Sequence, residues 1–187
     1  MTKVFDSFPV FDTERFHLRP FTPEDAPDLL RLMGDPEVTR YLGRFPLASL
    51  EEAQQRIAFF QKQFDERSGF IWGLVPHGEE HIVGQCLLFH FEAAHFRAEL
   101  GYGLIPAWWG KGAASEVARC IINFGFNTVH LHSIVAWIDP DNQGSRHVLR
   151  KQGFVQEAHF HEDFFDPVLQ RFTDTAAFGL LQRNWRP

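Results

Sequence analysis

Apolar residues recur along the chain with two different periods, which separate the expected helices from the expected strands. After Thr22 and again after Ser49, apolar positions are spaced three and four residues apart, as on the buried face of an amphipathic helix. Both residues can cap a helix, and each is followed three positions later by a carboxylate, Asp25 or Glu52, which completes a capping box. The pattern therefore predicts two helices near the N-terminus, separated by a loop around residues 38–47.

The rest of the chain is dominated by short apolar or alternating runs, which are typical of strands. These runs cover residues 14–21, 70–75, 81–91, 96–105, 133–138, 154–164 and 171–181. A helix of about four turns is expected after Gly112, and a shorter helix is expected to end at Gly153, because glycine commonly ends helices.

The order of these elements predicts the fold class. Strands 96–105 and 133–138 enclose one helix, so we expect them to be parallel neighbours joined by a right-handed crossover. The other strands are expected to follow one another as an antiparallel meander. We therefore predict an α+β protein that forms a single domain over residues 1–187, with a central mixed, mostly antiparallel sheet flanked by helices on both faces.

Composition narrows the class of protein. The chain has 187 residues, 44% of them hydrophobic, with 21 Phe and 5 Trp, which predicts a bulky aromatic core. Its net charge of −6 argues against nucleic acid as a partner. No apolar run reaches the length of a membrane span and no signal peptide is visible, so we expect a cytoplasmic protein without a membrane partner. Cys86 and Cys120 are expected to be free thiols.

The segment that joins strand 96–105 to the following helix is rich in glycine. Residues 109–114 read Trp-Gly-Lys-Gly-Ala-Ala, which fits neither a Walker loop nor a dinucleotide-binding fingerprint. Small side chains would leave the N–H groups of the loop and of the helix N-terminus uncovered, and Lys111 adds positive charge nearby. The segment therefore suits a pyrophosphate, although a tight strand-to-helix turn can have the same composition.

Three segments together carry a family resemblance. They begin at Phe11, Glu99 and Asp139 and read FDTERFHLRPFTPEDAPDLLRLMGDPEV, ELGYGLIPAWWGKGAASE and DPDNQGSRHVLRKQGF. In this order they resemble the GNAT acetyltransferase superfamily, and its RimJ/RimL branch in particular. The resemblance covers nearly the whole chain. It implies an enzyme that transfers the acetyl group of acetyl-CoA to a primary amine, either a protein N-terminal α-amine, as on ribosomal proteins, or a small amine.

The resemblance also implies which residues bind acetyl-CoA. Family members hold its pyrophosphate with a loop of the pattern Q/R-x-x-G-x-G/A. This loop corresponds here to Trp109, Gly110, Lys111, Gly112, Ala113 and Ala114. Trp109 replaces the usual Gln or Arg, which costs little because backbone N–H groups would hold the phosphates. By the same resemblance, N–H groups near Leu104 and Ile105 would hold the thioester carbonyl. Asn142 would lie near the pantetheine arm, or serve only as a turn or helix cap.

At the position of the residue that protonates the departing thiolate, this chain departs from the usual family pattern. Many members carry a tyrosine seven residues after the position of Asn142, and here that position is Leu149. In the RimJ/RimL branch a serine three residues after the asparagine is the substitute candidate, which is Ser145 here. Ser145 can instead form an ordinary hydrogen bond in the first turn of a helix.

Glu99 is the candidate base that deprotonates the amine. Gly101 and Gly103 share its strand face at two-residue spacing and would leave space beside its carboxylate. Glu99 can equally be a structural residue that forms a salt bridge on a solvated face of the strand. Glu157 is a second candidate base, and an α-amine, with a pKa of about 7.7–8.0, needs only a water path.

Ten histidines raise the question of a metal site. His159 and His161 share a strand face near carboxylates, and His130 and His132 repeat the spacing. Zinc sites need three or four converging ligands. Each of these two segments supplies only two histidines, with no sign that further ligands converge on them, so we predict no metal.

Two further questions stay open at this point. Trp108, Trp109, Phe160, Phe164 and Phe165 could wall an acceptor pocket, although packing is the default for most of them. A non-catalytic acyl-CoA-binding regulatory module is the alternative function. The acceptor amine and the oligomeric state, monomer or homodimer, are not specified by these patterns.

Overall fold

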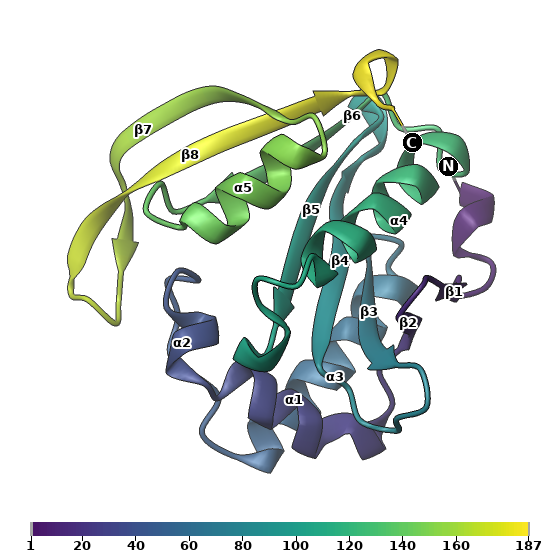
Figure 1. The fold of residues 1–187 in the computed structure, drawn as a ribbon, viewed down its shortest axis with the longest axis vertical. Helices are drawn as coiled ribbons and strands as arrows, with labels where there is room; N and C mark the ends of the chain where they lie inside the picture. Colours follow the sequence, from purple (N-terminus) through teal and green to yellow (C-terminus); the bar gives the residue numbers. More distant parts are fainter. Residues whose placement is uncertain (1, 187) are drawn as a thin grey trace.

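The computed structural model describes residues 2–186 and shows an eight-stranded sheet with helices packed against both faces (Figure 1). The strands are β1 Phe11–Asp12, β2 Phe16–Pro20, β3 Gly69–Pro76, β4 Gly84–Glu92, β5 Arg97–Leu104, β6 Ser133–Ile138, β7 Val155–Asp166 and β8 Arg171–Leu181. The α-helices are α1 Ala26–Met33, α2 Pro36–Thr39, α3 Leu50–Asp65, α4 Ala113–Asn127 and α5 Gln143–Lys151. Short 3-10 helices are η1 Thr2–Phe5, η2 Pro23–Asp25, η3 Ala93–His95, η4 Pro106–Trp108 and η5 Gln182–Asn184. The predicted α+β class is confirmed.

The N-terminal helices begin at the predicted capping residues. The Asp25 carboxylate accepts the backbone N–H of Thr22 at 2.7 Å, before η2 leads into α1. Ser49 Oγ accepts the backbone N–H of Glu52 at 3.2 Å and starts α3. The Glu52 carboxylate reaches one residue further back than a standard capping box and accepts the N–H of Ala48 at 2.8 Å.

One strand boundary differs from the sequence prediction. The predicted strand 81–91 begins only at Gly84, as β4. Ile82 donates its N–H to the Asp28 carboxylate at 2.8 Å, so this backbone group binds a helix side chain and not a neighbouring strand. The apolar character of Ile82 therefore reflects burial beside α1, whereas Val83 already donates its N–H to the carbonyl of Leu74 on β3 at 2.9 Å.

Strands β5 and β6 are parallel and are connected through α4, as predicted. They pair only from Arg97 opposite Ser133 to Glu99 opposite Val135. Beyond these residues their pairing ends, and we call this region, residues 100–104 of β5 and 136–138 of β6, the β5–β6 divergence. Backbone groups of two central strands are therefore left without a partner strand on the side where the strands separate.

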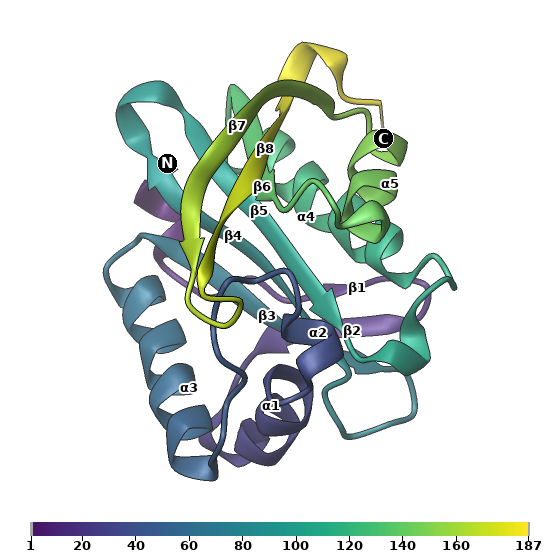
Figure 2. The same cartoon turned by 90° about the vertical axis from the view of Figure 1, so that its left-hand side faces the viewer.

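The meander prediction is wrong for the last two strands. The strand order is β1-β2-β3-β4-β5-β6-β8-β7, so the chain leaves β6 through α5, runs along the outer edge as β7 and returns inside it as β8. The long β7–β8 hairpin reaches over to the loop after α2 (Figure 2). There the Phe164 ring lies so close to Gly43 that a Cβ atom on Gly43 would collide with it.

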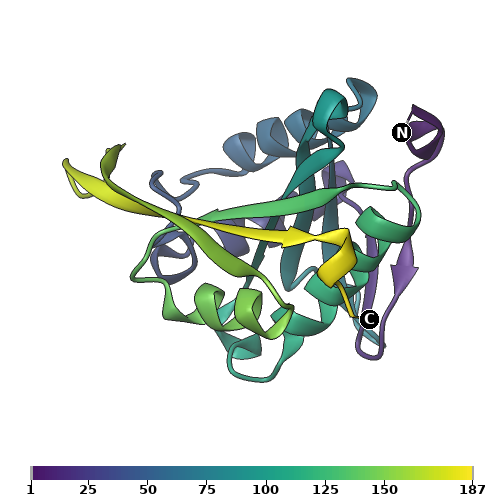
Figure 3. The ribbon, with the colours of Figure 1, turned by 90° about the horizontal axis from the view of Figure 1, so that it is seen from above.

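Two hydrophobic cores lie on opposite faces of the sheet. Helices α1 and α3 cover one face, with Leu29 and Ile57 buried there, and α4 and α5 lie on the other, with Ile121 fully buried (Figure 3). The predicted aromatic core is present on the α4 side, where the fully buried Trp72 packs between phenylalanine rings and donates its Nε1–H to the carbonyl of Pro9 at 2.7 Å. Both cysteines are free thiols, as predicted.

Candidate active site

The glycine loop leaves the N-terminus of α4 open. Gly110 and Gly112 have φ angles of 70° and 77°, which favour glycine, and no side chain caps the helix. A Cβ atom added to Gly110 would meet nothing within 4 Å. The first N–H groups of α4, beginning at Ala113, have no partner within the helix. Uncovered donors at a helix N-terminus suit a phosphate group, so the geometry of the loop is compatible with the predicted role.

Arg15, which the sequence analysis did not single out, holds this loop in place. Its guanidinium donates to the carbonyl oxygen of Lys111 at 2.8 Å and pairs with the Glu116 carboxylate at 2.6 Å. Burial alone would raise the pKa of Glu116, but hydrogen bonds, including those from Arg15, outweigh burial and lower it. Glu116 is therefore an anchor for the loop. On the other side, Trp109 donates its Nε1–H to the carbonyl of Leu104 at 2.7 Å.

The two predicted carbonyl-binding donors are not equivalent. Ile105 donates its N–H to the carbonyl of Val83 at 2.9 Å, so this group is already occupied. In an antiparallel strand, successive N–H groups point to opposite sides. The N–H of Leu104 therefore points away from β4 and toward the β5–β6 divergence. Of the two residues, only Leu104 remains a candidate donor.

Helix α5 carries Ser145 to the end of this divergence. Asn142 caps the helix by accepting the backbone N–H of Ser145 at 3.0 Å, which is the capping alternative that the sequence allowed. The Ser145 hydroxyl lies 2.9 Å from the phenol oxygen of Tyr102 on β5. Leu149, at the usual tyrosine position, is fully buried in the core.

Tyr102 is a second residue that the sequence analysis missed. Its phenol is largely enclosed, and desolvation raises its pKa well above the ordinary value, while the hydrogen bond from Ser145 opposes this effect. The phenol therefore keeps its proton at neutral pH. A tyrosine hydroxyl thus lies beside Ser145, although it comes from β5 and not from the usual helix position.

Glu99 lies on the opposite face of β5 from Tyr102. Its carboxylate contacts His90 Nδ1 at 3.0 Å, and only 19% of its side chain is exposed. Burial raises the pKa of Glu99, and the hydrogen bond with His90 opposes part of the rise. A raised pKa makes a carboxylate a stronger base, which suits a group that accepts a proton from an amine. The same contact is also the salt bridge that the sequence left as an alternative.

A cavity of about 270 Å³ opens on this same face of the sheet. Gln85 and Phe89 of β4 line it, and these residues pair with Gly103 and Glu99 of β5. Directly paired residues point to the same face, so Glu99 and the two glycines look toward the cavity side. A Cβ atom on Gly103 would meet nothing within 4 Å, which confirms that glycine leaves open space there.

The aromatic walls of this cavity are not those considered from the sequence. They come from Phe45, Phe59, Phe60 and Phe89. Trp108 instead packs on Phe16 at 4.8 Å between ring centres, and the phenylalanines of the β7–β8 hairpin are exposed beyond the cavity.

Comparison with known proteins identifies the family. The family model described as an acetyltransferase (GNAT) domain matches residues 15–155, most of the chain. The chain belongs to the GNAT family. It is an N-acetyltransferase, as are the relatives it resembles.

Two relatives and one solved structure illustrate the range of this family. An uncharacterized N-acetyltransferase of Bacillus subtilis is 35% identical over 80% of this chain and 85% of its own length. The ribosomal protein uS5-alanine N-acetyltransferase of Escherichia coli is 30% identical over 72% of this chain and 69% of its own, which agrees with the predicted RimJ/RimL branch. The spermidine N-acetyltransferase of Vibrio cholerae, solved with CoA and spermine, superposes with a TM-score of 0.79 at 22% identity, covering 90% and 96% of the two chains.

The second candidate base of this acetyltransferase comes from a different part of the sheet. Glu157 is exposed on the outer strand β7, with its carboxylate directly over Gly179 of β8. Strands β8 and β6 separate β7 from β5, which carries Glu99. Gly179 pairs with Val135 of β6, which in turn pairs with Glu99, so the Glu157 carboxylate lies over the same row of residues as Glu99, two strands away.

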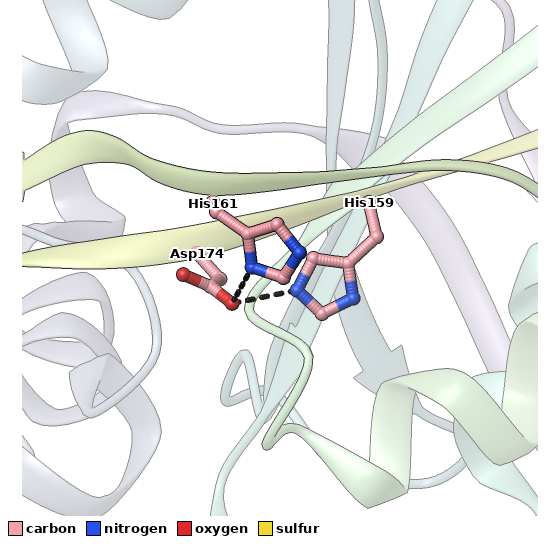
Figure 4. A group of neighbouring side chains, drawn as sticks. All are labelled: His159, His161 and Asp174. Carbon is pink, nitrogen blue, oxygen red and sulfur yellow. Dashed lines mark hydrogen bonds and ion pairs between the residues drawn. The ribbon is translucent and has the colours of Figure 1, made fainter.

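The histidines of the β7–β8 hairpin converge more than the sequence suggested. Asp174 of β8 lies opposite His159 and His161, and its Oδ2 contacts their ring nitrogens at 2.6 and 3.1 Å (Figure 4). The expectation that no third ligand converges is thus wrong. Asp174 Oδ1 also accepts the N–H of Glu162 at 2.9 Å, so both carboxylate oxygens have partners within the protein. The absence of a metal remains a prediction.

Among residues 2–186, no helix combines the length and the apolar character that crossing a membrane requires.

Proposed function

We propose that this GNAT acetyltransferase transfers the acetyl group of acetyl-CoA to a primary amine, either the α-amine of a protein N-terminus or the amine of a small molecule. One arrangement supports the proposal. Beside the β5–β6 divergence, Glu99 lies on the face with the cavity, and the Tyr102–Ser145 pair lies on the other face. A proton acceptor for an amine and a proton donor for a thiolate therefore lie on opposite faces of one strand.

The face with the cavity suits the acceptor amine. An amine attacks a thioester only when it is neutral, so it must lose a proton. Glu99 can accept that proton directly or through water, and His90 holds its carboxylate in place. An α-amine, with a pKa of about 7.7–8.0, needs this help less than a lysine amine with a pKa of about 10.4.

The other face suits the leaving group. The Tyr102 phenol and the Ser145 hydroxyl share a hydrogen bond, and the raised pKa of Tyr102 keeps a proton available there. We assign this pair to protonate, or hydrogen-bond to, the departing thiolate. The N–H of Leu104 would hold the carbonyl oxygen, and the open N-terminus of α4 with Lys111 would hold the pyrophosphate.

The functions by which the relatives are named cover both kinds of acceptor. The Escherichia coli relative is named for a ribosomal protein and the Vibrio cholerae structure for spermidine. We keep the further expectations of a single domain, a cytoplasmic location and no nucleic-acid partner as parts of the proposal.

A coupled assay tests this function against the alternative of a silent acyl-CoA-binding module. Purified protein would receive acetyl-CoA and a panel of peptides with free N-termini, lysine derivatives and small amines, with release of CoA thiol as the readout. The proposal expects amine-dependent CoA release that falls in Glu99→Gln. Binding of acetyl-CoA without release above background for any amine would favour the silent module.

A further inference from the structure

We propose that the cavity beside Glu99 binds the acceptor through an anionic group, so that the acceptor is a small primary amine that also carries a carboxylate or a phosphate. This inference rests on the proposed function, because it assigns the acceptor to the same site. It goes further by excluding polyamines as the preferred acceptors.

The side chains that line the cavity include two positive charges and no negative charge. Arg44, from the loop after α2, and Arg56 of α3 both line it, and no Asp or Glu is among its lining residues. Among residues 2–186, five arginines form ion pairs with carboxylates, and neither Arg44 nor Arg56 is one of them. Two positive side chains thus border the cavity, and neither forms an ion pair with a carboxylate among the described residues.

The two arginines border the same cavity and carry like charges. Arg44 exposes much of its surface, yet desolvation and the like charge of Arg56 lower its pKa. Like charges that are partly desolvated repel each other, and an anion placed between them would remove that repulsion. Guanidinium groups also match the planar geometry of a carboxylate or phosphate, which they bind with two parallel hydrogen bonds.

The other residues that line the cavity indicate which further groups the acceptor carries and how large it is. Gln85 is 6% exposed, and its Oε1 is buried without a hydrogen-bond partner among the described residues. A buried acceptor without a partner is unfavourable, so an N–H group of the ligand would satisfy it. The other walls are mainly apolar, including Met33, Phe60 and Phe89. A volume of about 270 Å³ is near the lower limit of ~300 Å³ for ligand pockets, which suits an amino acid or the end of a short peptide.

These features oppose a polyamine in this cavity. Spermidine and spermine carry several positive charges and no anionic group, so Arg44 and Arg56 would repel them. Glu99 is the nearby carboxylate, and it already contacts His90. We therefore expect this chain to differ in acceptor from the spermidine N-acetyltransferase of Vibrio cholerae.

Matched acceptors test the inference directly. Phenylalanine and glycyl-phenylalanine would each be compared with the corresponding C-terminal amide, phosphoethanolamine with ethanolamine, and spermidine would be added. We expect kcat/KM to be about 10- to 100-fold higher for the anionic member of at least one pair, as for a charge-assisted hydrogen bond. The pair that shows the effect distinguishes a carboxylate from a phosphate. Equal rates within every pair, or a preference for spermidine, would overturn the inference while leaving acetyl transfer intact.

Substitutions locate the effect in the cavity. Arg44→Met and Arg56→Met should raise KM for the anionic acceptor with little change in kcat, and the double variant should bring the ratio within each pair close to one. Arg56→Lys keeps the charge and should keep part of the ratio. Arg150→Met removes an exposed arginine from α5, on the other face of the sheet, and should leave the ratio unchanged. A double variant that retains the full ratio would contradict the assignment.

A binding measurement separates this inference from the proposed function. If no amine supports CoA release, calorimetric titration of phenylalanine and phenylalaninamide into the CoA-saturated protein decides the case. Binding of the acid alone, lost in the Arg44→Met/Arg56→Met variant, would support the anion site and reject catalysis. Equal binding of acid and amide, or binding of neither, would reject the anion site.

Discussion

At the scale of single residues, the chemistry of this protein depends on side chains that meet across β5. Glu99 and Tyr102 are three positions apart on one strand, so they point to opposite faces. Burial raises the pKa of both groups and so favours the protonated form of each. The carboxylate becomes a better proton acceptor, and the phenol remains protonated. One strand can thus present a base and an acid to the two sides of one reaction.

The hydroxyl pair should act as a unit. We expect Ser145→Ala to lower kcat by about 10- to 100-fold, the weak end of general-acid effects, with acetyl-CoA affinity nearly unchanged. Tyr102→Phe should lower kcat at least as much, because it removes the group whose proton is retained. The double variant should be little worse than Tyr102→Phe alone, since residues that share one hydrogen bond are not additive. Wild-type turnover in both single variants would remove the pair from the mechanism.

Glu99 predicts the pH dependence of the reaction. Its folded-state pKa lies above the ordinary value, so the fraction of enzyme with a deprotonated base falls as the pH is lowered through that raised pKa. We expect kcat/KM to fall on the acidic side in the wild type. Glu99→Gln should lower kcat/KM by at least about 100-fold for a lysine-type amine, and by less for an α-amine. Glu92→Gln, which changes an exposed carboxylate paired with Arg97, serves as the control. An unchanged pH profile in Glu99→Gln would favour a water path.

At the scale of elements, the β7–β8 hairpin depends on one cross-strand carboxylate. Asp174 of β8 binds two histidines and a backbone N–H of β7. The hydrogen bond from the Glu162 N–H, followed by the one from His159, lowers the pKa of Asp174 from 3.8 to about 2. The negative form is therefore favoured by the folded hairpin.

This shift predicts a specific loss of stability in acid. Because the folded-state pKa is depressed, the contribution of Asp174 is fully present above the unfolded pKa of 3.8 and is lost as the pH falls toward about 2. Asp174→Asn should lower the urea midpoint at pH 6, and the difference from wild type should shrink by pH 2.5. Asp163→Asn, on the same hairpin, should show neither effect.

Metal analysis of the purified protein should find no stoichiometric metal. Zinc that is present in the wild type and lost in Asp174→Asn would contradict that prediction.

At the scale of the whole molecule, ligand binding should be visible as stability. A ligand that binds only the folded state raises Tm by mass action, so saturating acetyl-CoA should raise it. Gly112→Val should reduce that rise far more than it lowers Tm without ligand, because φ at Gly112 is 77° and a side chain there would also stand over the open loop. Equal shifts with acetyl-CoA in wild type and variant would show that this loop does not hold the ligand.

Local patterns in the sequence predicted most of the elements of this fold, but not the partners that complete the site. The capping residues of η2 and α3 and the β5–α4–β6 crossover follow from short-range spacing. Ser145 and Tyr102 are 43 positions apart, and Arg15 and Glu116 are 101 apart, so no local pattern could reveal either contact. The insertion of β8 between β6 and β7 is likewise a choice between long-range pairings of similar strands.

The early end of the β5–β6 pairing gives the molecule two additional strand edges inside its own sheet. Edges with unpaired N–H and C=O groups readily accept another extended chain. The amide hydrogens of Tyr102 and Leu104, which point into the divergence, should therefore exchange quickly with deuterium in the free protein, although they lie in a central strand. A bound pantetheine arm is itself extended and carries amide groups, so it can complete the sheet as a surrogate strand. Slow exchange at these amides only after acetyl-CoA is added would show that the substrate supplies the missing edge of the fold.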